Sequence, residues 1–146
     1  MMGKLKQVLL VDDSKATNFF NKTIIEKLNC AEEVVTVQNG EEALKWIQSN
    51  SIHPELIFLD INMPVMDGWE FLSEYQKLED KDEKAVIVLM IGAALSKEEL
   101  IKANSISEIK EFSEKMLSKI TVGKIINQYF NDIDIESNSS ENNRVL

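Results

Sequence analysis

Short apolar runs recur along the chain, separated by longer segments of mixed character. The runs are rich in Val, Ile and Leu and occupy residues 8–11, 34–37, 56–59 and 86–91. Apolar runs of this length predict strands buried on both faces, as in a parallel sheet. A weaker run near residues 109–113 predicts a fifth strand.

The segments between these runs have the spacing of helices. In residues 14–28, Ala16, Phe20, Ile24 and Leu28 recur every four residues and predict one apolar helix face. Ser96 and Glu99 form the pattern of a capping box at the start of another helix. Further helices are expected after Asn39-Gly40, over residues 69–78 and over residues 121–130. Five strand–helix pairs predict an α/β fold: a doubly wound parallel sheet with helices on both faces.

Composition limits the classes of protein that fit this pattern. The 146 residues are 44% hydrophobic and 28% charged, with a formal net charge of −9, which argues against binding nucleic acid. No apolar run approaches the roughly 20 residues of a membrane span, and no signal peptide is recognisable. A single cysteine excludes an internal disulfide framework and suits the cytoplasm. We expect one domain over residues 1–130 and an acidic, disordered tail over residues 131–146.

Carboxylates follow two of the predicted strands. Asp12 and Asp13 come directly after the first strand, and Asp60 comes after the third. Ligands of doubly wound sheets bind at the carboxyl ends of the strands, so these side chains are expected to lie together. Three converging carboxylates repel one another unless a cation lies among them, and an all-oxygen site suits Mg²⁺. The sequence therefore predicts a magnesium site.

Three motifs resemble those of response-regulator receiver domains of two-component signalling. They are VLLVDDS at residues 8–14, NGEEAL at residues 39–44, and residues 56–72 with the core DINMPVMDG. The resemblance covers roughly residues 5–130, and the third motif is highly specific. It implies a flavodoxin-like strand order of 2-1-3-4-5.

The resemblance also implies a role for individual residues. Asp60 would be the phosphoacceptor, and Lys115 would pair with the phosphoryl oxygens. Asp13, Asp60 and the backbone carbonyl of Asn62 would bind Mg²⁺ directly, with Asp12 acting through water. Phe112 matches the aromatic switch position. These residue types supply the nucleophile, the metal and the cation that phosphoryl transfer requires.

The sequence departs from the family pattern at two positions. The family has Thr or Ser at the end of the fourth strand, where this chain has Met90 (or Ile91, if the alignment slips by one residue). The family proline after the lysine is replaced by Met116, so a trans Lys115–Met116 bond is expected. Both departures affect the switch and leave the acidic positions intact.

The leading interpretation is a stand-alone, chemotaxis-type single-domain response regulator that is not a dedicated enzyme. It would receive a phosphoryl group from a histidine kinase or phosphotransfer protein and signal to a downstream protein through its fourth helix, fifth strand and fifth helix. The alternative is a pseudo-receiver, a binding module that works without phosphorylation. A haloacid-dehalogenase-type phosphatase fits less well, because Asn62 stands where its second aspartate belongs. A flavodoxin-type electron carrier also fits less well, because this chain lacks the phosphate-binding loop that such a carrier has after its first strand.

Overall fold

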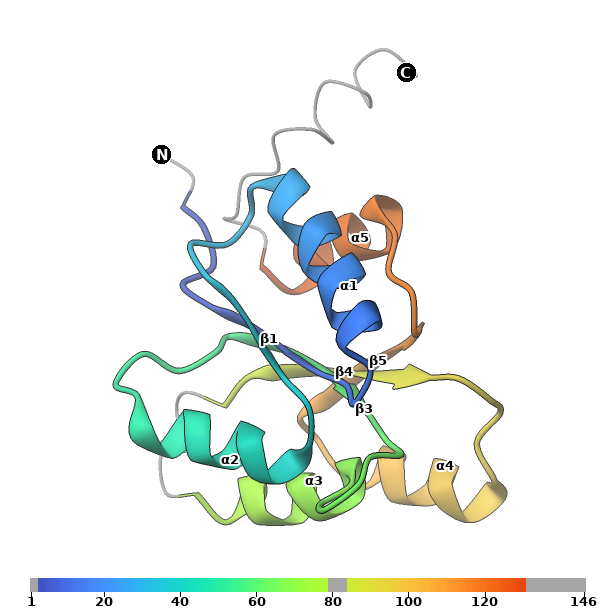
Figure 1. Ribbon diagram of the computed structural model, residues 1–146. Helices are drawn as coiled ribbons and strands as arrows, with labels where there is room; N and C mark the ends of the chain where they lie inside the picture. The colour runs from blue at the N-terminus through green and yellow to red at the C-terminus, as the bar shows by residue number, and fades with distance from the viewer. Residues whose placement is uncertain (1–2, 79–83, 131–146) are drawn as a thin grey trace.

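Five parallel strands form the centre of the computed structural model, which describes residues 3–78 and 84–130 (Figure 1). The strands are β1 (Val8–Val11), β2 (Val34–Val37), β3 (Leu56–Asp60), β4 (Val86–Ile91) and β5 (Ile109–Glu114). They pair in the order β2-β1-β3-β4-β5. The fold and strand order expected from the sequence are thereby confirmed.

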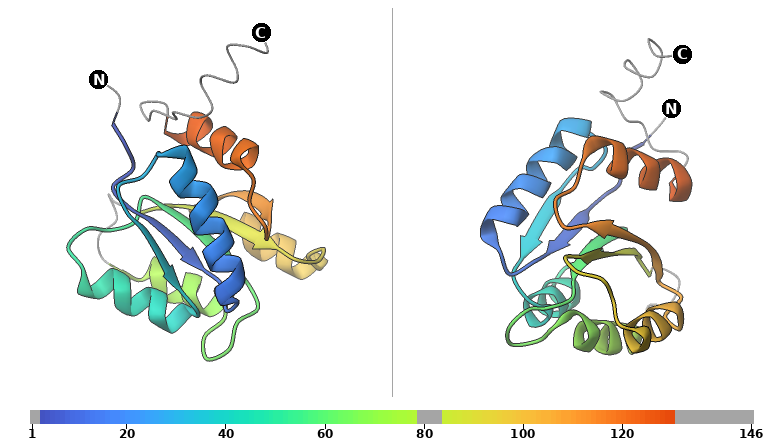
Figure 2. Two further views of the ribbon diagram at one scale, coloured as in Figure 1. Left: turned by 45° about the horizontal axis from the view of Figure 1, so that its top comes forward. Right: turned by 90° about the vertical axis from the view of Figure 1, so that its right-hand side faces the viewer.

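Five helices cover the two faces of this sheet. They are α1 (Lys15–Leu28), α2 (Gly40–Ser49), α3 (Gly68–Gln76), α4 (Lys97–Asn104) and α5 (Lys119–Tyr129). Helices α1 and α5 lie side by side on one face, and α2, α3 and α4 lie on the other (Figure 2). Parallel strands need such crossover helices, so both faces of the sheet become buried.

The strands alternate their side chains between two apolar layers. Leu9, Ile57 and Leu89 point towards the layer beneath α2, α3 and α4. Leu10 and Phe58 point towards the layer beneath α1 and α5. All five side chains are completely buried. Burying a large aliphatic or aromatic side chain contributes about 1.5–3 kcal/mol, so these two layers supply most of the stability.

Each helix begins at a side chain that satisfies a free backbone N–H group. The capping residues are Ser14, Asn39, Asp67, Ser96 and Ser118. Ser96 and Glu99 form the predicted capping box of α4, with each side chain accepting a hydrogen bond from the other residue's backbone. Such caps contribute about 1 kcal/mol each and fix where the helices begin.

The buried face of α1 differs from the predicted one. Ala16 and Phe20 are exposed and Ile24 is only partly buried, whereas Asn18 and Asn21 are buried along with Leu28. The prediction was wrong because it assumed that buried positions are apolar. Both asparagines hydrogen-bond to backbone groups of the sheet and its loops, which offsets the cost of burying their amides, fully for Asn21 and for the Nδ2 group of Asn18.

The loop between β3 and α3 folds back on the end of β3. The N–H of Gly68 donates to the carbonyl of Ile61 at 2.7 Å. Within the loop, the N–H of Met66 donates to the carbonyl of Pro64 at 2.7 Å, which closes a γ-turn centred on Val65. Val65 has a φ of 69° and is 74% exposed. This left-handed conformation is uncommon for a β-branched residue.

Three further expectations concern the backbone and the ends of the chain. The Lys115–Met116 bond is trans, as predicted. The predicted acidic tail, residues 131–146, lies outside the described residues. Within residues 3–78 and 84–130, no helix has both the length and the apolar character to cross a membrane.

Candidate functional site

The carboxyl ends of neighbouring strands bring three carboxylates together. Asp12 and Asp13 follow β1, and Asp60 is the last residue of β3, which pairs directly with β1. One oxygen from each carboxylate lies within 4.8 Å of the others. We call Asp12, Asp13 and Asp60 the acidic cluster. It lies where the strand order reverses, which is where doubly wound sheets bind ligands.

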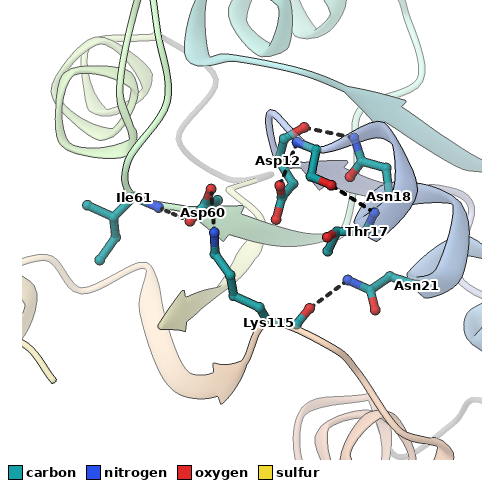
Figure 3. A network of polar contacts seen from close by, with 8 residues as sticks. Asp12, Thr17, Asn18, Asn21, Asp60, Ile61 and Lys115 are labelled. Carbon is teal, nitrogen blue, oxygen red and sulfur yellow. Dashed lines mark hydrogen bonds and ion pairs between the residues drawn. The ribbon is translucent and has the colours of Figure 1, made fainter. Parts of the chain in front are cut away.

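Asp60 is buried between its own backbone and a lysine from a distant segment. Its side chain is 3% exposed. Its Oδ1 accepts a hydrogen bond from the N–H of Ile61 at 2.9 Å. Its Oδ2 lies 3.2 Å from Nζ of Lys115, which follows β5 (Figure 3). The structure therefore places Asp60 and Lys115 in direct contact, although 55 positions separate them in the sequence.

Asp12 and Asp13 differ in their surroundings. Asp12 is completely buried, and its Oδ1 accepts a hydrogen bond from the N–H of Ser14 at 2.8 Å. Its Oδ2 is buried and has no hydrogen-bond partner among the described residues. Asp13 is exposed. The cluster thus combines a buried, unsatisfied carboxylate oxygen with an exposed carboxylate that solvent reaches.

Burial and mutual charge interactions shift the pKa values of the groups in this site. Burial raises the pKa of Asp12. Burial, followed by the negative charge of Asp12, raises the pKa of Asp60, although the contact with Lys115 opposes this shift. Burial tends to lower the pKa of Lys115, but its hydrogen bond and charge interaction with Asp60 outweigh that effect and raise it. A second cation among the carboxylates would relieve the repulsion that remains.

A divalent cation fits the residues of the acidic cluster. Carboxylate oxygens are the ligands that Mg²⁺ prefers, and Mg²⁺ retains several waters, which the exposed side of Asp13 leaves room for. The unsatisfied Oδ2 of Asp12 is the kind of buried polar atom that a hydrated ion satisfies. Asn62, the fourth predicted ligand, lines the cavity beside Asp60.

That cavity has a volume of about 170 Å³ and opens between the ends of β3, β4 and β5. Its lining residues are Asp60, Ile61, Asn62, the segment 90–95, Glu99 and Lys115. The segment 90–95 contains no hydroxyl side chain. The cavity is therefore large enough for a small anion, with a cation at one side but without a Ser or Thr donor on β4.

Of the two predicted switch residues, Met90 borders the cavity but is buried in the core, and Phe112 does not line the cavity. Met90 is the register partner of Asp60, but its side chain is 1% exposed and packs into the layer beneath α1 and α5. A β-carbon at Gly92 would instead lie 3.4 Å from Cδ of Lys115. Phe112 pairs with Leu89, is 40% exposed and does not line the cavity. Position 92, rather than 90, is thus the position on this segment that faces Lys115.

Two residues at the site escaped the sequence analysis, Asn18 and Asn21 of α1. Asn18 donates to the carbonyls of Asp12 and Val37, and Asn21 binds the backbone on both sides of Met116. The signal was present in the sequence. Positions 18, 21, 25 and 28 have helical spacing and end in Ile25 and Leu28, so they form one face of α1.

Comparison with known proteins gives a consistent result. Residues 8–127 match the family model described as the response regulator receiver domain. Chemotaxis protein CheY of Halobacterium salinarum is 33% identical over 101 residues, covering 68% of this chain and 79% of that protein. A response regulator structure from Cytophaga hutchinsonii is 28% identical with a TM-score of 0.76, covering 88% of this chain and 99% of that one.

Other relatives are longer proteins. A protein-glutamate methylesterase/protein-glutamine glutaminase of Caldanaerobacter subterraneus is 29% identical over 138 residues, which cover 87% of this chain but 37% of the relative. The chain spans less than two thirds of the length of this and several other curated relatives.

Proposed function

The chain belongs to the response regulator receiver domain family, and on that basis we propose that it is a cytoplasmic response regulator phosphorylated on Asp60. The observation that carries the proposal is the environment of the Asp60 carboxylate. Asp60 lines a cavity of about 170 Å³, its Oδ2 contacts Nζ of Lys115 at 3.2 Å, and two further carboxylates lie close to it. A nucleophile, a cation and a group of carboxylates that could hold a metal ion are thus adjacent.

The residues divide the chemistry between them. Asp60 supplies the attacking oxygen, and the ammonium of Lys115 compensates charge on the equatorial phosphoryl oxygens. Asp13, Asp60 and the backbone carbonyl of Asn62 would hold Mg²⁺, with Asp12 bound through water. When bound, Mg²⁺ supplies positive charge that offsets the charge of the phosphoryl group. Burial of Asp60 excludes bulk water from the carboxylate.

The proposed partners are proteins. A histidine kinase or a phosphotransfer protein would donate the phosphoryl group, and a downstream protein would receive the signal. The output face would comprise α4, β5 and α5, where four large apolar side chains are exposed: Leu100, Ile101, Phe112 and Ile120. Exposed apolar side chains on adjoining elements favour a protein-binding surface. Beyond its own phosphorylation and dephosphorylation, we assign the chain no separate reaction.

One observation favours a second candidate, the pseudo-receiver. The cavity wall formed by residues 90–95 has no hydroxyl group to bind a phosphoryl oxygen. A charge-assisted hydrogen bond contributes about 1.5–3 kcal/mol, which is comparable to the coupling energy between a site and a distant surface. Without this bond, the chain would bind its target in one conformation, whether or not Asp60 is phosphorylated.

Phosphorylation by a small donor separates the two candidates. Wild type and Asp60→Asn are incubated with acetyl phosphate, with and without Mg²⁺, and the mass of the intact protein is measured. The proposed function predicts one added phosphoryl group on the wild type in the presence of Mg²⁺ and none on Asp60→Asn. An unmodified wild type at saturating donor and Mg²⁺ would favour the pseudo-receiver.

A further inference from the structure

We propose that Asn21 is a positioning residue for Lys115, holding its backbone so that Nζ reaches Asp60. The inference deepens the proposed function and rests on it for the catalytic consequence. It starts from the segment 115–118 between β5 and α5, which we call the lysine loop. This loop carries Lys115 and has Met116 where the family pattern has proline, so its backbone is not restrained by a proline ring.

The side-chain amide of Asn21 forms hydrogen bonds with the lysine loop at two points. Its Nδ2 donates to the carbonyl of Lys115 at 2.9 Å (Figure 3). Its Oδ1 accepts from the N–H of Leu117 at 2.9 Å. Donor and acceptor thus bind the peptide groups on either side of Met116. Asn21 itself is completely buried. A buried amide with both ends bonded has one orientation, so it fixes the backbone that it binds.

The rest of the loop offers less restraint. The strand before it, β5, lies at the edge of the sheet and pairs only with β4. The side chain of Met116 is 50% exposed, while Leu117 packs into the layer beneath α1 and α5. The Lys115 side chain is itself 36% exposed. Its long, flexible stem reaches Asp60 reproducibly only if its backbone is held in place.

Asn18 provides a matched comparison one helical turn away. It is also a nearly buried asparagine of α1, but its Nδ2 donates to the carbonyls of Asp12 and Val37 at 2.9 and 3.0 Å. Asn18 therefore holds the loop that carries Asp12 and Asp13, and Asn21 holds the loop that carries Lys115. The two residues should affect separate properties of the site.

We predict that removing the Asn21 amide lowers the rate of phosphorylation without weakening the binding of Mg²⁺. Asn21→Ala frees the lysine loop, so the rate of phosphorylation by acetyl phosphate at saturating Mg²⁺ should fall on the order of tenfold to a hundredfold. The Kd for Mg²⁺, measured by calorimetry, should not rise, because no carboxylate is altered and moving the ammonium of Lys115 away from Asp60 removes a competing positive charge. Asn18→Ala should instead raise that Kd. If Asn21→Ala both lowers the rate and raises the Kd for Mg²⁺, Asn21 supports the whole site rather than Lys115, and the proposal fails.

A double-mutant cycle tests whether Asn21 acts through Lys115. In a Lys115→Ala background the same Asn21→Ala substitution should change the rate no further, because the group it positions is gone. An undiminished effect in that background would overturn the proposal. If Asn21→Ala does not fold, Asn21→Ser replaces it, with a hydroxyl too short to bind both peptide groups. If neither folds, Asn21 is structural and the proposal is wrong.

A crystal structure of the Asn21 variant decides the matter independently of phosphorylation. We expect the contact between Nζ of Lys115 and Oδ2 of Asp60, 3.2 Å in the wild type, to be lost. Its persistence would overturn the proposal. A wild type that acetyl phosphate does not modify would instead defeat the proposed function, and the crystal structure would still test whether Asn21 positions Lys115.

Discussion

Gly68, the first residue of α3, lies directly against the backbone of Asp60. A β-carbon at position 68 would be 2.6 Å from the Asp60 carbonyl oxygen and 2.9 Å from Cα of Ile61. Both neighbours are backbone atoms, so neither can rotate away. The start of α3 and the residue at the centre of the proposed site therefore share one tightly packed contact.

We expect Gly68→Ala to displace Asp60 and to destabilise the protein by about 1–3 kcal/mol, the usual cost of overpacking. Helix propensity alone predicts the opposite sign, because Ala is favoured over Gly by about 1 kcal/mol. Urea unfolding measures the difference. Gly92→Ala is the matched control: its β-carbon would meet only the flexible Lys115 stem, at 3.4 Å or more. Equal stability of Gly68→Ala and wild type would contradict the packing argument.

The buried carboxylate of Asp12 makes stability depend on pH. Its pKa is raised in the folded state by burial, so between the unfolded value near 3.8 and the raised value the folded state binds more protons. Stability contributed by this group is therefore present below that window and is lost as pH rises through it. Asn at position 12 cannot ionise, and its Oδ1 can still accept the hydrogen bond from Ser14.

Asp12→Asn should accordingly be more stable than wild type at pH 7 without Mg²⁺, and the gain should shrink towards pH 4. Denaturant unfolding at both pH values measures it. Saturating Mg²⁺ should reduce or reverse the gain, since the ion stabilises only the ionised cluster. A gain that is the same at both pH values would show that ionisation of Asp12 is not its cause.

Metal binding to the acidic cluster should stabilise the folded state by mass action. Millimolar Mg²⁺ should raise the melting temperature of the wild type; at a hundred times Kd the stabilisation is about 2.7 kcal/mol. Asp13→Ala should abolish the increase, and because Asp13 is exposed the variant should fold normally. Glu26→Ala, an exposed acid of α1 outside the cluster, is the control. An unchanged increase in Asp13→Ala would place the ion elsewhere.

The missing switch hydroxyl is best restored at position 92. A β-carbon there would face the Lys115 stem, and Gly92 has a backbone conformation that other residues adopt freely. We expect Gly92→Ser to enlarge the chemical-shift changes that beryllofluoride induces around Phe112 and α4. Met90→Thr should not, because Met90 lies in the core; it should instead cost about 2–4 kcal/mol. Large changes in the wild type, no larger in Gly92→Ser, would show the hydroxyl to be dispensable.

Most of the fold followed from the sequence because four of the five strands, β1 to β4, are nearly continuous apolar runs. Such a run has few alternatives to burial on both faces, and an acid directly after it marks the edge of the sheet. The acidic cluster was predictable for the same reason. Asp12, Asp13 and Asp60 each follow a run, and adjacent parallel strands bring their ends together.

The polar side of the core was not predictable in the same way. Asn18 and Asn21 are buried because of backbone groups far away in the sequence, such as the carbonyl of Lys115. A hydrophobicity pattern contains no information about these partners. Met90 illustrates a related limit. β4 ends at Ile91, so Met90 is still within the strand and packs in the core, whereas Gly92 lies just beyond it and faces Lys115; the sequence alone does not locate this end to the residue.

The γ-turn at Val65 is a position where a substitution could stabilise the protein and so offset destabilising substitutions elsewhere. Holding a non-glycine residue at positive φ costs about 1–3 kcal/mol, and asparagine tolerates positive φ more readily than valine. Val65→Asn should therefore raise the free energy of unfolding by about 1 kcal/mol, measurable with urea, and Val65→Ala, which lacks that preference, should gain less. The side chain is 74% exposed, so the gain should come without repacking the interior. Such a variant would be a suitable parent for Gly68→Ala or Asn21→Ala, because its extra stability would keep those substitutions folded while their effects on the site are measured.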